Sequence, residues 1–166
     1  MDGNAVRPGT IRRYGEGFEG RIERRLDHGP DAVWRMLTEP DQFVQWLAPG
    51  TIELREGGRV HIDFGDSGVV IDSPLLAFDP PRLLAYSWSS GDEPNRPLHW
   101  EVEPAEGGSL LTLTIRIPAD EDIAKACAGF DAHLDMLAAA LEGVPIKFPF
   151  QRYVDARKAY QEMVAA

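Results

Sequence analysis

Four side chains of this sequence could transfer protons near neutral pH, namely His28, His61, His99 and His133. General acid–base chemistry would need a carboxylate partner beside at least one of them inside a cleft. His61 and His99 stand next to Asp63 and Glu101 on the polar sides of alternating stretches, which turns these side chains toward water. We therefore expect surface pairs at these positions and no catalytic site.

His28 and His133 lie in different surroundings. His28 precedes the Gly29-Pro30 turn, where we expect it to be solvated. His133 falls beside an apolar helical stripe, between Phe130 and Leu137, so it alone could reach the edge of a cavity. An isolated histidine with no assignable partner is weak evidence for catalysis.

Other reactive groups are sparse. Cys127 is the single cysteine, which excludes an internal disulfide, and its place on the helical stripe indicates a core residue. Asp72 is the one carboxylate whose facing the pattern leaves open, because a bulge at Pro74 would change it. The sequence contains no metal-ligand spacing, phosphate loop or nucleophile elbow, so we predict no metal, no cofactor and no catalytic residue. A cyclase or hydrolase remains an alternative.

The composition narrows the classes of partner. The chain has 166 residues and is 43% hydrophobic, which suits one domain with a substantial core. Seventeen Lys and Arg against 27 Asp and Glu give a formal charge of −10, which disfavours nucleic acid and anionic lipid. Without a signal peptide or a membrane-length apolar run, the sequence predicts a cytoplasmic protein that does not insert into membranes.

The secondary structure that positions these residues is predicted to begin with a strand. Apolar and polar residues alternate over residues 14–26, which predicts a strand with one buried face, although Gly15 and Gly17 could interrupt it. A short helix should follow and end at Glu39-Pro40. A second short helix should carry its apolar side chains at Phe43, Val44, Trp46 and Leu47.

Residues 51–117 are predicted to form antiparallel strands divided by turns. Each strand has an apolar side and a polar side, as with Val60, Ile62 and Phe64 against Arg59, His61 and Asp63. In "FDPPRLLAYSW", Pro80-Pro81 marks a turn, and a fresh strand then presents an aromatic face. That face meets either a packed core or a cavity.

The last third is helical. Residues 120–143 carry a helical stripe that includes Cys127 and Phe130, and Gly143 and Pro145 end the helix. A further helix follows in "PFQRYVDARKAYQEMVAA". A one-sided sheet needs a cover, so the order of elements predicts an α+β fold in which the long helix covers the sheet. Small helix residues such as Ala126 and Ala138 would leave space between the two layers.

Several stretches together resemble the START-like, SRPBCC superfamily, and within it the bacterial homologues of the heat-shock-protein-90 ATPase activator domain. They are "PDAVWRMLTEPDQFVQWL", "DPPRLLAYSW", "LLTLTI" and "GFDAHLDMLAAALEG", in this order across roughly residues 20–143. The last of them carries Gly129-Phe130 where many relatives have Gly-Trp. The extension after residue 143 departs from the shortest relatives.

The resemblance implies a helix-grip fold, in which a curved antiparallel sheet holds the long helix over a hydrophobic cavity. We expect residues 1–9 to form a flexible tail and residues 10–166 a single domain of this type. The expected function is the binding of a small apolar or aromatic ligand in that cavity. Its predicted lining comprises Phe64, Tyr86, Trp88, Trp100, Phe130, His133, Leu134 and Leu137.

Other interpretations of the same sequence stay open. The activator resemblance implies a chaperone as an alternative partner, although only a short tail stands where a second, chaperone-binding domain would be. A cavity enzyme would need an acid–base pair, and the strand alternation supplies none. Neither the identity of a ligand nor the formation of a homodimer follows from the sequence.

Overall fold

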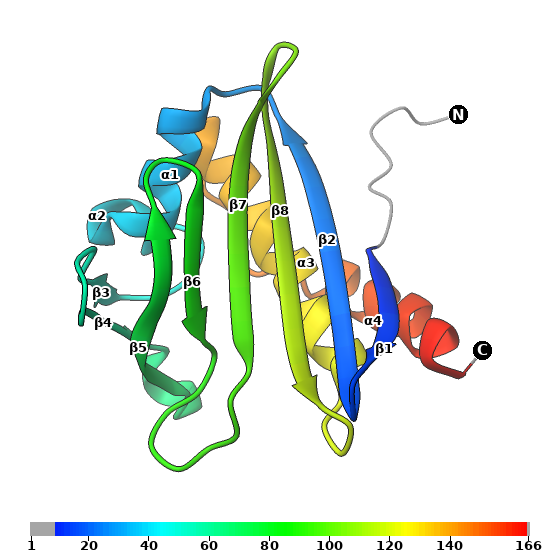
Figure 1. Ribbon diagram of the computed structural model, residues 1–166. Coiled ribbons are helices and arrows are strands. Elements are labelled where there is room, and N and C mark those ends of the chain that lie inside the picture. The colour runs from blue at the N-terminus through cyan, green and yellow to red at the C-terminus, as the bar shows by residue number, and fades with distance from the viewer. Residues whose placement is uncertain (1–8, 166) are drawn as a thin grey trace, which may run out of the picture.

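The computed structural model describes residues 9–165 as an antiparallel sheet with helices on one face (Figure 1). Eight strands follow one another across the sheet in the order β1-β2-β8-β7-β6-β5-β4-β3. Their bounds are β1 Thr10–Tyr14, β2 Gly17–Leu26, β3 Gly50–Ile52, β4 Arg59–Asp63, β5 Val70–Asp79, β6 Leu83–Ser87, β7 Pro97–Ala105 and β8 Gly108–Pro118. The predicted tail, apart from Gly9, lies outside the described residues.

The first predicted strand is in fact a hairpin. β1 and β2 pair with one another, and Gly15 in the turn between them has a φ of 57°. This left-handed backbone suits glycine, which has no Cβ to clash with the neighbouring carbonyl. The predicted long strand is thus divided into two strands at Gly15, one of the two glycines that we expected could interrupt it.

Two short helices lie between β2 and β3 in the chain, as predicted. They are α1 (Pro30–Thr38) and α2 (Pro40–Phe43). α2 ends earlier than expected: the next residues continue as tight turns, with the amide of Trp46 bonded to the carbonyl of Phe43. Val44 is consequently exposed, whereas the Trp46 side chain is buried and its Nε1 donates to the Met36 carbonyl at 2.7 Å.

The long helix α3 (Ile123–Leu141) covers the sheet, crossing behind β7, β8 and β2 in Figure 1. Asp122 caps its N-terminus by accepting from the amide of Lys125. The last helix, α4 (Phe150–Ala165), packs on α3 and on β1. Among residues 9–165, no helix is long and apolar enough to cross a membrane.

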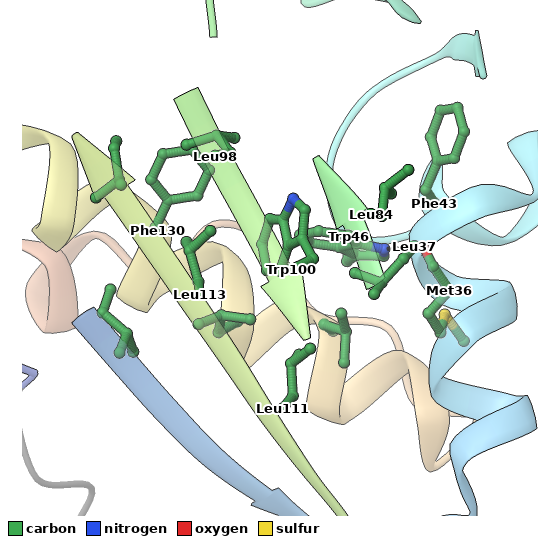
Figure 2. Close-up of a cluster of buried hydrophobic side chains, with 14 of the residues drawn as sticks. Met36, Leu37, Phe43, Trp46, Leu84, Leu98, Trp100, Leu111, Leu113 and Phe130 are labelled. Carbon is green, nitrogen blue, oxygen red and sulfur yellow. Dashed lines mark hydrogen bonds between the residues drawn. The ribbon is translucent and has the colours of Figure 1, made fainter. Parts of the chain in front are cut away.

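The side chains of the sheet point inward or outward as the alternation predicts. Val60, Ile62, Leu98 and Trp100 are buried, whereas His61 is exposed. Trp100 lies at the centre of the core, with its ring 5.8 Å from Trp46 and 6.2 Å from Phe130 (Figure 2). The Pro80-Pro81 peptide, which is cis, forms the turn between β5 and β6. The predicted α+β, helix-grip fold is confirmed.

Candidate functional site

A pocket of about 510 Å³ opens between the sheet and α3, and we call it the α3 pocket. β8 contributes side chains to its floor, the ends of β4 and β6 contribute aromatic rings, and α3 forms the opposite wall. It is lined by Phe64, Val69, Trp88, Arg96, Ile115, Ile117, Glu121, Asp122, Lys125, Ala126, Gly129, Phe130 and His133. Pockets of this size accommodate small organic ligands.

Aromatic rings form a continuous surface along the α3 pocket. Trp88 meets Phe130 edge to face with ring centroids 5.1 Å apart, and Phe64 meets Trp88 at 5.8 Å. The His133 ring continues the series, 6.1 Å from Phe64. Edges and faces of such rings suit an apolar aromatic guest.

Gly129 keeps the helix wall of the pocket open. It lies in the middle of α3, and a Cβ built at this position would meet no heavy atom within 4 Å. Glycine inside a helix is roughly 1 kcal/mol less favourable than alanine. The chain thus has a helix-weakening residue at a point where a larger side chain would occupy the pocket.

The rim of the pocket is charged. Arg96, from the connection between β6 and β7, binds Glu121 before α3 through two bonds of 2.6 and 2.9 Å. Its Nη1 also donates to the Trp88 carbonyl at 2.9 Å. The helix cap at Asp122, which accepts from the Lys125 amide and from Arg157, holds the pKa of this carboxyl below its usual range. Both rim carboxylates therefore have cationic partners.

His133 is the histidine that lines the α3 pocket, whereas His61 is exposed and His28 and His99 are half-buried outside it. Nδ1 of His133 lies 2.8 Å from the Trp46 carbonyl oxygen. Burial lowers the pKa of His133 below 6.5, and the hydrogen bond to Trp46 opposes this shift in part. His28, outside the pocket, contacts Glu142.

The predicted lining residues divide into two groups. Four of them line the α3 pocket, namely Phe64, Trp88, Phe130 and His133. The other four, Tyr86, Trp100, Leu134 and Leu137, lie in the packed core and are at most 2% exposed. Trp100 donates from Nε1 to the Tyr86 hydroxyl at 3.3 Å, which gives this buried pair an internal partner. Alternation identifies the inward face but not where along a strand the packing opens.

Sequence reasoning missed the helix glycine and the charged rim. Gly129 was detectable as an isolated glycine inside an apolar helical pattern, which calls for a packing or functional reason. Ile115 and Ile117 belonged to the predicted apolar face of their strand, but nothing distinguished them from core. Arg96 and Glu121 lie 25 positions apart in loops, and no local pattern pairs them.

A buried polar network lies outside the α3 pocket and was also missed. Arg24 on β2 donates to Asp131 and to Asp135 on α3, at 2.7 Å in each case. The Tyr160 hydroxyl on α4 donates to Asp131, and the amide of Gly9 donates to that hydroxyl at 2.7 Å. The network ties β2, α3 and α4 together, and none of these residues lines the pocket.

The remaining reactive groups, Cys127 and Asp72, lie outside the α3 pocket. Cys127 is buried in the core, and burial raises the pKa of its thiol to about 12. Asp72, whose facing the sequence left open, lies at the surface and binds Arg59 at 2.8 Å. No group of three or more potential metal ligands occurs among the residues that the structure describes.

Several solved structures share this arrangement of elements. CalU16 from Micromonospora echinospora is 23% identical, with a TM-score of 0.79 over 95% of this chain and 96% of that one. A Bordetella parapertussis protein, BPP1335, is 26% identical, with a TM-score of 0.68 over 97% and 94% of the two chains. DynU16, from the dynemicin biosynthetic locus, is 26% identical, with a TM-score of 0.70 over 76% of this chain and 48% of its own.

No curated protein sequence matches the chain significantly. A family model does match: the model described as "Activator of Hsp90 ATPase homolog 1-like protein" covers residues 27–142. These residues run from just after β2 to just after α3 and include the whole lining of the α3 pocket. The START-like resemblance is thereby confirmed, and the chain belongs to the family of activator of Hsp90 ATPase homolog 1-like proteins.

Proposed function

We propose that the protein binds a small, largely aromatic molecule in the α3 pocket. The observation that carries this proposal is the open helix wall at Gly129, opposite the rings of Phe64 and Trp88. Protein interiors are normally packed to the density of organic crystals, and an apolar opening of about 510 Å³ departs from that rule. A ligand would restore the contacts that these rings lack.

The walls of the pocket favour an apolar guest over a charged one. Phe64, Trp88 and Phe130 offer ring surface, and burial of apolar area contributes about 25 cal/mol per Å². Arg96 and Glu121 bind each other at the rim, and Lys125, which also lines the pocket, is exposed to water. DynU16 belongs to a biosynthetic locus, a setting in which a domain that binds small molecules has a use.

Thermal melts with a panel of aromatic and lipid probes test the proposal. A ligand that binds only the folded chain raises stability by about 2.7 kcal/mol at a hundredfold excess over its Kd. We expect aromatic probes to raise the melting temperature of the wild type and of a His61→Ala, His99→Ala variant equally, since neither histidine lines the pocket. A panel without any shift in either protein would contradict the proposal.

A second candidate, stimulation of a chaperone ATPase, rests on the family match across residues 27–142. The purified protein would be added to the bacterial chaperone while its ATP hydrolysis is followed. A several-fold acceleration would support this activity. If the rate stays at its basal value over a wide excess of the protein, the activator function is excluded for that chaperone.

A further inference from the structure

His133 is fixed within the wall of the α3 pocket. Its ring stands between Phe64, at 6.1 Å, and Phe148, at 5.4 Å, with both rings meeting it edge to face. Nδ1 lies 2.8 Å from the Trp46 carbonyl oxygen. Aromatic packing and this hydrogen bond together fix the orientation of the imidazole.

The hydrogen bond determines which nitrogen carries the proton. A carbonyl oxygen can only accept, so Nδ1 must be the N–H donor. Burial lowers the pKa of His133, which keeps the ring neutral near pH 7. A neutral ring with a proton on Nδ1 leaves Nε2 as a hydrogen-bond acceptor.

Nε2 has no hydrogen-bond partner among residues 9–165, whereas both carboxylates at the rim of the pocket are engaged. Glu121 accepts twice from Arg96, and Asp122 accepts from the Lys125 amide and from Arg157. The aromatic neighbours of His133 contribute no donor. The pocket wall therefore offers one neutral acceptor, and a guest must supply the proton.

A hydroxyl group suits this acceptor better than an ammonium group. An ammonium ion would lose its hydration between Phe64, Trp88 and Phe130, and both rim carboxylates are already paired with cations. A phenolic hydroxyl is neutral near pH 7 and donates one hydrogen bond. It also leaves the attached ring free to pack on the aromatic wall.

We infer that the α3 pocket selects hydroxylated aromatic molecules, with Nε2 of His133 accepting the hydrogen bond of the ligand hydroxyl. This inference rests on the proposed binding function and specifies its ligand class. His133 would set specificity by orienting the ligand rather than by transferring a proton. Nε2 favours ligands with a hydroxyl group over those without one, because a ligand that lacks the donor would leave Nε2 unpaired in an apolar site.

The test compares two probes of similar shape, 2-naphthol and 2-methoxynaphthalene, by isothermal titration. We expect the wild type to bind 2-naphthol roughly two- to tenfold more tightly, as for a single neutral hydrogen bond. In His133→Phe the aromatic packing stays and the acceptor is lost, so this preference should disappear. Equal binding of both probes to the wild type, or an unchanged preference in His133→Phe, would overturn the inference and leave the proposed function standing.

Two further outcomes separate the claims. If neither probe binds the wild type while other aromatic probes raise its melting temperature, the inference fails and the proposed function stands; if no probe of the panel binds, both fail. If His133→Phe does not fold, long-range ¹H–¹⁵N spectra of the wild type decide the question. The Nε2 resonance of His133 should then shift with 2-naphthol and not with 2-methoxynaphthalene, and an Nε2 resonance that ignores bound 2-naphthol would overturn the inference.

Discussion

Arg24 on β2 and Asp131 on α3 form a buried ion pair, with 2.7 Å between Nη2 and Oδ1. The Arg24 side chain is 9% exposed and that of Asp131 is fully buried. Asp131 also accepts from Tyr160, so one carboxylate joins the sheet to both long helices. Buried charges are costly unless they are paired, and Arg24 pairs with two carboxylates although its Nε has no hydrogen-bond partner within the described part of the chain.

Replacing Asp131 with alanine should destabilise the protein by about 3–5 kcal/mol, since Arg24 would keep a buried charge with only Asp135 beside it. Urea denaturation measures the loss. The matched control is Glu23→Ala in the exposed Arg21–Glu23 pair, whose atoms are 3.4 Å apart, and it should cost at most about 1 kcal/mol. Equal losses in the two variants would show that the buried network contributes no special stability.

Trp100→Ala should cost roughly 3–5 kcal/mol, because the fully buried indole packs between Trp46 and Phe130 and its removal leaves a cavity. The double variant His61→Ala, His99→Ala should stay within about half a kcal/mol of wild type. Parallel thermal melts compare them. If the double variant proved the less stable of the two, the assignment of the sheet faces would be wrong.

Stability should decrease as the pH falls below 6.5, because the folded state lowers the pKa of His133 from that value and the unfolded chain binds the proton first. One such group contributes at most about 1.4 kcal/mol per pH unit. Carboxylates with a lowered pKa, such as Glu19 and Asp122, change the stability only at more acidic pH. In urea melts across this pH range, His133→Phe should show a smaller loss than the wild type, and an identical loss would assign the effect to other groups.

Cys127 should not react with thiol reagents in the folded protein. Its thiol is buried and burial raises its pKa to about 12, so thiolate is scarce at about pH 8. The aromatic disulfide DTNB should therefore label the chain only after unfolding in guanidinium. Rapid labelling of the native protein would mean that α3 opens readily from the sheet.

Where one face of a strand is buried, the sequence predicted correctly which side chains point inward and which point outward. Alternation placed Val60 and Ile62 inward and His61 outward, and the structure agrees. Arg24 shares its parity with the buried residues Ile22 and Leu26, so the strand pattern also places its side chain on the face toward α3. Identifying its partner Asp131 required the tertiary arrangement of two elements 107 positions apart.

The division between core and pocket could not be predicted in the same way. Tyr86 and Trp88 share parity and chemistry, yet Tyr86 is packed against Trp100, and Trp88, just beyond the end of β6, lines the α3 pocket. The difference depends on sheet curvature and on the volume left free across from Trp88. That volume depends in part on Gly129, whose effect is a missing side chain rather than a pattern of residues.

The Gly129→Phe variant, compared with Gly129→Ala, tests the proposed binding site most directly. Alanine should raise stability by about 0.5–1 kcal/mol through helix propensity and leave most of the pocket free. Phenylalanine finds no obstructing atom near its Cβ and should fill the pocket while the protein stays folded. Isothermal titration with 2-naphthol should then show near wild-type affinity for Gly129→Ala and at least a roughly tenfold loss for Gly129→Phe, as expected where a bound guest and the new ring would overlap. Unchanged affinity in a folded Gly129→Phe variant would contradict the assignment of the α3 pocket as the binding site.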